Sequence, residues 1–281
     1  MNAIYGNKRL KVLAYHNVLN KERFEQQITY LKSHFNLISL TKLGEYFFNE
    51  KDLPDNALLV TFDDGDKSLY ENAFPILKKH NIPAVIFIIT GLIDTHKPFW
   101  WDEIEYYLGK EEGNKKVWEV KNWSNKSRVE YLASIREKSD KPFFTYTQLT
   151  STQLNEIQMG GIDIANHSHT HPMFNQCTFE ELENEMEESK NILNALNLYA
   201  DIFAYPNGNY SEISEGILKK AGVKIAFLFD HKKNKGNINP LRISRLMVND
   251  NTSILKLKFI LSGWHGKFLP IIKVASKFFK K

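Results

Sequence analysis

The sequence predicts an α/β fold, namely a distorted (β/α)7 TIM-like barrel with an insertion on one rim. Two observations predict it. Short apolar, β-branched runs recur along the chain, each followed by a helical pattern, and several runs are apolar throughout, as parallel strands covered on both faces are. A chain of 281 residues can fill one such barrel, and we expect a single domain over residues 1–281.

Seven runs are predicted as strands because they are short, rich in apolar and β-branched residues, and bounded by turn formers. In chain order they are Lys11–Tyr15, Ala57–Phe62, Ala84–Ile89, Gly161–Ala165, Ile202–Tyr205, Lys224–Phe229 and Leu241–Val248. Helical patterns between them include Phe24–Ser33, Tyr70–His80 and Phe179–Leu196, the last with Thr178 and Glu181 as a capping box. The segment of about 95–153 breaks this alternation and is interpreted as the insertion.

Composition and charge exclude several classes of protein. A lone Cys177 permits neither an internal disulfide nor a thiolate zinc site, and no run of 18 apolar residues could span a bilayer. The net charge of +4 originates in residues 251–281, which hold seven lysines and no Asp, Glu or Arg. Because the basic residues gather at one end of the chain, we expect no nucleic-acid partner.

The basic C-terminal tail, at about 266–281, has a short amphipathic pattern, with Lys273 and Lys277 opposite apolar residues. Two interpretations stay open: peripheral contact with an anionic membrane, or a terminal helix that packs on the barrel. The amino terminus shows no apolar stretch typical of a secretory signal. We therefore expect a location in the cytoplasm or at the cytoplasmic face of the membrane.

Chemically active residues follow the predicted strands at their carboxyl ends. His16 follows the first strand, Asp63 and Asp64 the second, His167 to His171 the fourth, and the Tyr205-Pro206-Asn207-Gly208 turn the fifth. In a parallel barrel these ends share the face where active sites are built, so residues distant in sequence should converge there.

The segment Thr61-Phe62-Asp63-Asp64-Gly65-Asp66 places three carboxylates within four residues. Such crowding raises pKa values unless a cation is bound or the groups take different roles. Adjacent residues leaving a strand point in different directions, which would let Asp64 bind a metal while Asp63 stays free as a base. An Asx-turn with Gly65 in a left-handed conformation is the alternative.

The segment Asn166-His167-Ser168-His169-Thr170-His171-Pro172 holds three of the nine histidines within five residues. Imidazole is a preferred zinc ligand, and two histidines with Asp64 would form a three-ligand set with an open position, the pattern of catalytic zinc. Pro172 disfavours a helix at His171, so a strand end and loop are expected. The later turn around Pro206 is either a plain turn or a site at which the Asn207 N–H serves as an oxyanion donor.

Together, the Thr-Phe-Asp-Asp-Gly segment, the His-Ser-x-x-His spacing and the Tyr-Pro-x-Gly turn resemble the motifs of the polysaccharide deacetylases, over about residues 8–250. The resemblance implies a divalent metal, usually zinc, held by Asp64, His167 and His171. It further implies that Asp63 is the general base and that the backbone amide of Asn207 helps to hold the acyl oxygen.

The sequence departs from the family pattern in two places. Many members carry Arg where this chain has Ala204, and Arg242 or Arg245 is the candidate substitute for that tether of the base. The late Leu-x-His motif is absent, but Leu13-Ala14-Tyr15-His16 resembles the first strand of the poly-N-acetylglucosamine deacetylase branch. His16 is therefore the candidate general acid, with a structural strand-capping role as the alternative.

The expected activity is metal-dependent removal of N-acetyl groups from amino sugars in a polysaccharide, an oligosaccharide or a lipid-linked glycan. The candidate substrate-binding residues are Tyr205, Pro206, Trp101, Arg242 and Arg245. Two alternatives remain: a two-metal amidohydrolase in which His169 is a further ligand, and a non-catalytic glycan-binding barrel that retains the metal site.

Overall fold

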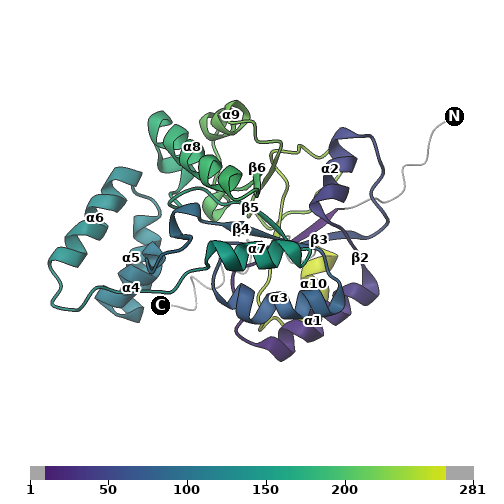
Figure 1. Ribbon diagram of the computed structural model, residues 1–281, viewed down its shortest axis with the longest axis horizontal. Helices are drawn as coiled ribbons and strands as arrows, with labels where there is room; N and C mark the ends of the chain where they lie inside the picture. Colours follow the sequence, from purple (N-terminus) through teal and green to yellow (C-terminus); the bar gives the residue numbers. More distant parts are fainter. Residues whose placement is uncertain (1–9, 264–281) are drawn as a thin grey trace, which may run out of the picture.

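The computed structural model describes residues 10–263, and its centre is a curled sheet of parallel strands (Figure 1). The strands are β1 (Lys11–Tyr15), β2 (Asn36–Leu37), β3 (Ala57–Phe62), β4 (Ala84–Ile88), β5 (Asp163–Asn166), β6 (Tyr199–Ala204), β7 (Ile225–Phe227) and β8 (Leu246–Met247). Their order is β7-β6-β5-β4-β3-β1-β8, and β2 pairs with β3.

The segment of residues 240–248 connects the two ends of this sheet. Ile243 forms a parallel bridge with Phe227 of β7, whereas Leu246 and Met247 pair with β1. The sheet therefore curls until β7 and β1 share one connecting segment. This arrangement confirms the predicted α/β class and its barrel-like parallel sheet.

Ten α-helices lie within the part of the chain that the structure describes. They are α1 (Lys21–His34), α2 (Leu40–Phe48), α3 (Phe74–His80), α4 (Trp100–Leu108), α5 (Lys110–Val120), α6 (Asn125–Glu137), α7 (Ser151–Met159), α8 (Phe179–Ala195), α9 (Glu212–Lys220) and α10 (Ile254–Ser262). Leu13 of β1 lies in one apolar core with residues of α1, α3, α7 and α10, and Phe203 of β6 lies in another with residues of α8 and α9. Burial of both sheet faces explains why the strands are apolar throughout.

The predicted strands and helices agree with the structure in their positions along the chain better than in their end residues. Each predicted strand overlaps an observed one, although β5 ends one residue later and β6 begins three residues earlier than predicted. The predicted strand Leu241–Val248 pairs as a strand only at Leu246–Met247, because the segment changes partner from β7 to β1. The capping box of α8 is confirmed, since Thr178 and Glu181 each accept a hydrogen bond from the other's backbone N–H. The sequence analysis did not predict β2 or α2.

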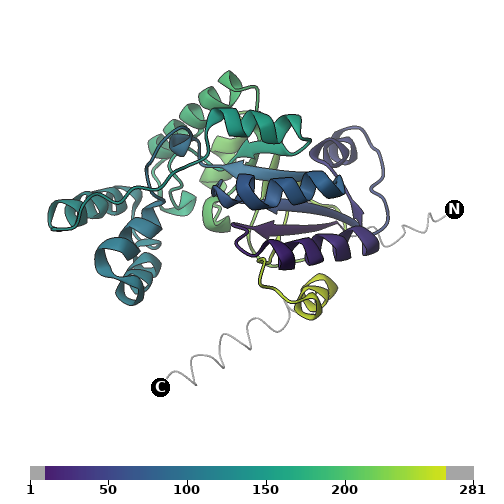
Figure 2. The same ribbon diagram turned by 60° about the horizontal axis from the view of Figure 1, so that its bottom comes forward.

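The predicted insertion consists largely of helices. The helices α4, α5 and α6 stand to one side of the sheet in both views (Figures 1 and 2). Apolar residues of these helices, among them Trp100, Ile104 and Leu132, form a separate core with Met173, which follows β5. The helix α7, which starts just inside the expected limit of residue 153, belongs instead to the crossover from β4 to β5.

The predicted basic tail of about 266–281 lies outside the described residues. Within residues 10–263, no helix combines the length and the hydropathy needed to cross a bilayer.

Candidate metal centre and active site

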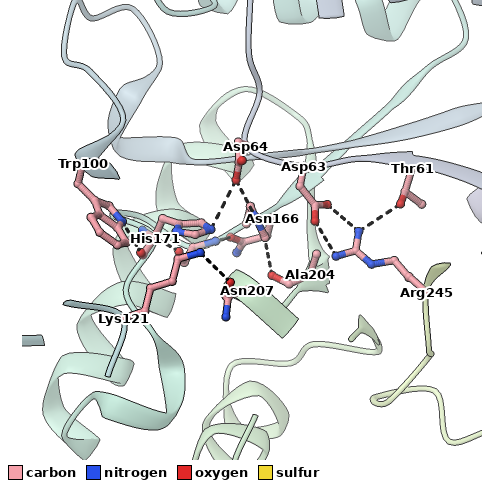
Figure 3. Close-up of polar contacts among 12 residues, drawn as sticks. Thr61, Asp63, Asp64, Trp100, Lys121, Asn166, His171, Ala204, Asn207 and Arg245 are labelled. Carbon is pink, nitrogen blue, oxygen red and sulfur yellow. Dashed lines mark hydrogen bonds and ion pairs between the residues drawn. The ribbon is translucent and has the colours of Figure 1, made fainter. Parts of the chain in front are cut away.

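Three predicted ligands meet at the carboxyl ends of the strands. Asp64 follows β3, and His167 and His171 follow β5. The carboxylate oxygen Oδ1 of Asp64 lies 3.3 Å from Nε2 of His167 and 3.5 Å from Nε2 of His171 (Figure 3). The three ligand atoms lie within 4.8 Å of one another, as the ligands of one metal ion must. Residues separated by about a hundred positions in sequence thus converge as expected.

The backbone around the ligands adopts conformations that aim the side chains inward. Asp64 has a φ of 70° and His171 a φ of 55°, in the left-handed region that non-glycine residues seldom occupy. Gly65, at φ 80°, completes the turn after Asp64 and packs against Ile88, leaving no space for a Cβ. Strained residues of this kind persist where the surrounding structure fixes them, and they cluster at functional sites.

Hydrogen bonds to neighbouring elements hold the loop of residues 167–171, called the histidine loop below. Asn166 donates to the Ser189 hydroxyl of α8 over 2.9 Å and accepts from the Ser168 N–H over 2.8 Å. One carboxylate oxygen of Glu185, also on α8, accepts the backbone N–H groups of His169 and Thr170, each over 2.8 Å. These bonds fix the loop before any ligand binds.

The orientation of His167 is set by its second ring nitrogen. Nδ1 lies 2.8 Å from the carbonyl oxygen of Ala204, and a carbonyl can only accept a hydrogen bond, so Nδ1 carries a proton. In the neutral ring, Nε2 then presents a lone pair toward Asp64. A backbone carbonyl in this position is the usual means by which proteins orient a metal-binding histidine.

The donor set fits a divalent cation. Two imidazole nitrogens face a carboxylate oxygen, and Oδ1 of Asp64 is buried without a hydrogen-bond partner among the described residues. Such lone pairs repel one another unless a proton or a cation lies between them. Two histidines and one aspartate leave a position open for water or substrate, as catalytic zinc sites do.

The pKa values reflect burial opposed by nearby charge. Burial alone would raise the pKa of Asp64, but the neighbouring imidazoles of His167, His16 and His171 hold it well below its usual range. Burial would lower the pKa of His167, but the Asp63 and Asp64 carboxylates raise it. Burial prevails at His171 and lowers its pKa to about 3. His171 is therefore neutral near pH 7, as a metal ligand must be.

Asp63 is turned away from the ligand set and is held by Arg245 (Figure 3). Nη1 and Nη2 of Arg245 donate to Oδ1 and Oδ2 of Asp63 over 2.6 and 2.7 Å. Arg245 is fully buried, and it also donates to the Leu228 carbonyl and the Thr61 hydroxyl. Burial would raise the pKa of Asp63, but the charges of Arg245 and His167 and the hydrogen bonds from Arg245 together outweigh this and hold the pKa below its usual range.

Of the two arginines proposed as the missing tether, Arg245 contacts Asp63 and Arg242 does not. Nε of Arg242 pairs with Glu215 of α9 over 2.5 Å, and its guanidinium lies over the ring of Tyr210. Arg242 is therefore absent from the lining of the cavity beside the metal ligands. Both arginines follow β7 in sequence, and only the path of the connecting segment distinguishes them.

A cavity of about 250 Å³ opens beside the metal ligands. His16, Asp63 and Asn207 line it from the barrel, together with the three metal ligands. The ring of His16 packs edge-on against Phe229, with centroids 5.4 Å apart. The predicted base, acid and oxyanion residues therefore share one cavity with the metal site.

The insertion provides the other wall of this cavity, which the sequence analysis mostly missed. Its lining residues are Trp101, Glu105, Asn114, Val117, Trp118 and Lys121. Of these only Trp101 was predicted, and its ring contacts His171 with centroids 4.8 Å apart. No local motif marks the others, because only the docking of α4 and α5 onto the barrel brings them to the site.

Two predicted substrate-binding residues and the predicted additional metal ligand lie outside the catalytic cavity. Tyr205 is fully buried, and its hydroxyl lacks a hydrogen-bond partner among the described residues. Pro206 is buried at the start of the 3-10 turn Pro206–Gly208, so both residues shape the turn and neither lines the catalytic cavity. His169 packs against Gly91 and contacts the Thr90 hydroxyl, apart from the cluster of three ligands.

Comparison with known families agrees with this geometry. The polysaccharide deacetylase family model matches residues 50–226, well over half of the chain. The chain belongs to the polysaccharide deacetylase family. It is accordingly an enzyme of the polysaccharide N-deacetylase type, a hydrolase of non-peptide carbon–nitrogen bonds, and this family is metal-dependent.

Individual relatives extend the likeness along almost the whole chain. A poly-β-1,6-N-acetyl-D-glucosamine N-deacetylase of Staphylococcus aureus strain MRSA252 is 27% identical over 266 residues, covering 94% of this chain and 78% of the relative. The enzyme of the same name from Staphylococcus epidermidis is 23% identical over 267 residues, covering 95% and 77%.

Solved structures share the fold. The Streptococcus pyogenes deacetylase PplD in complex with acetate has a TM-score of 0.66 at 20% identity, covering 90% of this chain and 98% of its own. IcaB from Ammonifex degensii also has a TM-score of 0.66 at 20% identity, covering 92% and 97%. The predicted barrel fold is thereby confirmed.

Proposed function

We propose that this protein is a zinc-dependent N-deacetylase that acts on glycans containing N-acetylglucosamine. One observation carries the proposal: Asp64, His167 and His171 converge as a ligand set, while the adjacent Asp63 stays outside it and is held by Arg245. A metal site beside a separate, positioned carboxylate is the arrangement that hydrolysis of an amide requires.

The residues of the cavity have distinct roles in this proposal. Asp64, His167 and His171 would hold a divalent cation, which would supply Lewis-acid activation of a water molecule and of the acetamide carbonyl. Asp63 accepts the proton of the attacking water, since each of its oxygens keeps a second lone pair beside the bond to Arg245. Arg245 orients this carboxylate and keeps it ionised.

Asn207 and His16 serve the two ends of the bond that breaks. The backbone N–H of Asn207 donates to the acyl oxygen as negative charge develops there. His16 donates a proton to the sugar nitrogen as the carbon–nitrogen bond breaks. Acetate and a free amino sugar are the products.

A β-1,6-linked N-acetylglucosamine polymer is the proposed substrate, because the two staphylococcal relatives that match 94% and 95% of this chain are named for it. A second cavity of about 600 Å³ shares Trp101 and His171 with the catalytic one, and its lining includes Phe99, Trp100 and Phe144. Aromatic rings offer sugars flat apolar surfaces, so this cavity supports a substrate of several sugar units.

The test is release of acetate from poly-β-1,6-N-acetylglucosamine oligomers by the zinc-loaded protein and by the Asp63→Asn variant. We expect the parent to release acetate and the variant, which keeps the shape of the side chain but lacks the base, to be slower by at least about a hundredfold. The zinc content of both proteins is measured as a control. Equal rates in parent and variant would refute the role of Asp63.

A further inference from the structure

Lys121 enters the catalytic cavity from the insertion. It directly follows α5, and its Nζ donates a hydrogen bond to Oδ1 of Asn207 over 3.1 Å (Figure 3). The same ammonium lies 4.7 Å from the ring centroid of Trp118. Both contacts, and the lysine itself, lie in the cavity that holds the metal ligands.

The surroundings of this lysine differ from those of an ordinary surface lysine. It is half-buried and forms no ion pair with any carboxylate in residues 10–263, so an amide oxygen and an indole ring replace part of its water shell. Burial lowers the pKa of Lys121, while the more distant Asp64 acts in the opposite direction. Removing water from an ammonium costs free energy, which the contacts of Lys121 with Asn207 and Trp118 must offset.

The turn that carries Asn207 is held on its other side by tight packing. Asn207 has a φ of 55°, and Gly208 follows at a φ of 71°. A Cβ on Gly208 would lie 2.4 Å from the backbone nitrogen of Phe229, so this glycine fits closely against the strand end. The hydrogen bond to Lys121 restrains the side chain of Asn207, a residue that lines the cavity, and through Cα it restrains the adjoining peptide planes.

We propose that Lys121 is a positioning residue for deacetylation, and that it acts by holding Asn207 in the orientation in which its backbone N–H meets the acyl oxygen. This inference rests on the proposed function. By this inference the end of α5, in the insertion, is part of the active site. Removing the lysine would break the hydrogen bond by which the insertion restrains the Pro206–Gly208 turn. A group that aligns an oxyanion donor acts on the transition state more than on the bound substrate.

A double-mutant cycle tests this role. The variants are Lys121→Met, Asn207→Gly and both together, and glycine at this position of the turn retains the backbone N–H and accepts the positive φ while removing Oδ1. We expect Lys121→Met to lower kcat for acetate release by about tenfold or more with little change in KM, as the loss of a hydrogen bond to a charged group does. In the Asn207→Gly background the same substitution should have little further effect.

Two further variants separate positioning from general damage. Lys121→Arg keeps a charged donor and should restore most of kcat. Lys115→Met makes the same substitution on α5 at a side chain that is 74% exposed and pairs with Glu111, and it should match the parent. Bound zinc and thermal unfolding are measured for every variant, because a merely structural role would change these and leave the arginine variant no better than the methionine one.

The outcomes are distinct. A Lys121→Met variant with the parental kcat would overturn the inference while leaving the proposed function intact. An equal loss of kcat in the parent and in the Asn207→Gly background would also overturn it, since the lysine would then act without Asn207. Failure of the zinc-loaded parent to release acetate would instead refute the proposed function, and the role of Lys121 with it.

Discussion

Replacing Arg245 by methionine would leave the Asp63 carboxylate buried without its counter-ion. The arginine side chain is fully buried and that of Asp63 is 4% exposed, so water cannot take the place of the guanidinium. Removing one partner of such a buried pair costs about 3–5 kcal/mol. Arg245→Met also leaves the Leu228 carbonyl and the Thr61 hydroxyl without a donor, so we expect a loss near the upper end of this range at pH 7.

The free energy of unfolding that Arg245→Met loses should depend on pH in a defined direction. In the parent, Arg245 holds the pKa of Asp63 below its unfolded value, so the ionised carboxylate contributes stability above about pH 4, and this contribution disappears as the pH falls through the lower folded pKa. In Arg245→Met the guanidinium is lost, so burial, which is the largest influence on Asp63, raises the folded pKa of this carboxyl. Protonation of Asp63 then removes the buried, unpaired charge from the variant. The difference in free energy of unfolding between the parent and Arg245→Met therefore shrinks as the pH falls from 7 toward 4.

The assay is urea unfolding followed by circular dichroism at several pH values, with a chelator present so that loss of metal does not contribute. Arg242→Met is the matched control, since the side chain of Arg242 is 37% exposed and its partner Glu215, although 6% exposed, keeps the ammonium of Lys219 at 2.9 Å. The free energy of unfolding lost in this variant should therefore stay closer to the roughly 1 kcal/mol of a solvent-exposed pair than to the cost of breaking a buried one. The reasoning is refuted if both variants lose the same free energy of unfolding, or if the loss in Arg245→Met does not change with pH.

Three further predictions concern the metal site and the acid. Zinc-reconstituted protein should contain about one zinc ion per chain by mass spectrometry. The His169→Ala variant should retain this ion and the His171→Ala variant should lose it. Two ions per chain would instead favour the two-metal amidohydrolase. Glu185→Ala frees the N–H groups of the histidine loop and should weaken zinc affinity about 10–100-fold in competition with a chromogenic chelator, and an unchanged affinity would contradict the orienting role. His16→Gln should lower kcat about 10²–10⁴-fold at unchanged zinc content, and a parental rate would exclude His16 as the acid.

Much of the metal site could be predicted from sequence because its signals are local. A pair of aspartates and a cluster of histidines each occupy a few consecutive residues, and both follow apolar runs that are recognisable as strands. Parallel strands place their carboxyl ends on one face, so convergence follows from the fold class. The same reasoning placed His16 and Asn207 beside the metal ligands, and the cavity contains both.

Residues that act through long-range contacts escaped this reasoning. Arg242 and Arg245 lie three positions apart, and the sequence offered no reason to prefer either as the partner of Asp63. Lys121 lies in a segment whose helices were not predicted, because its polar composition carries a weak periodic signal. Tyr205 and Pro206 were assigned to substrate binding from their motif, and only the structure shows that both are buried and absent from the lining of the catalytic cavity.

The order of residues along the chain determined which chemical groups this protein has and at which strand ends they stand, because periodicity and short motifs are properties of neighbouring residues. The tertiary structure alone decided that Arg245 holds Asp63, and that Lys121, from a helical insertion, reaches the turn that carries Asn207. These pairings depend on where the connecting segment crosses from β7 to β1 and on how α5 docks. Both result from packing between distant parts of the chain, which no local pattern encodes.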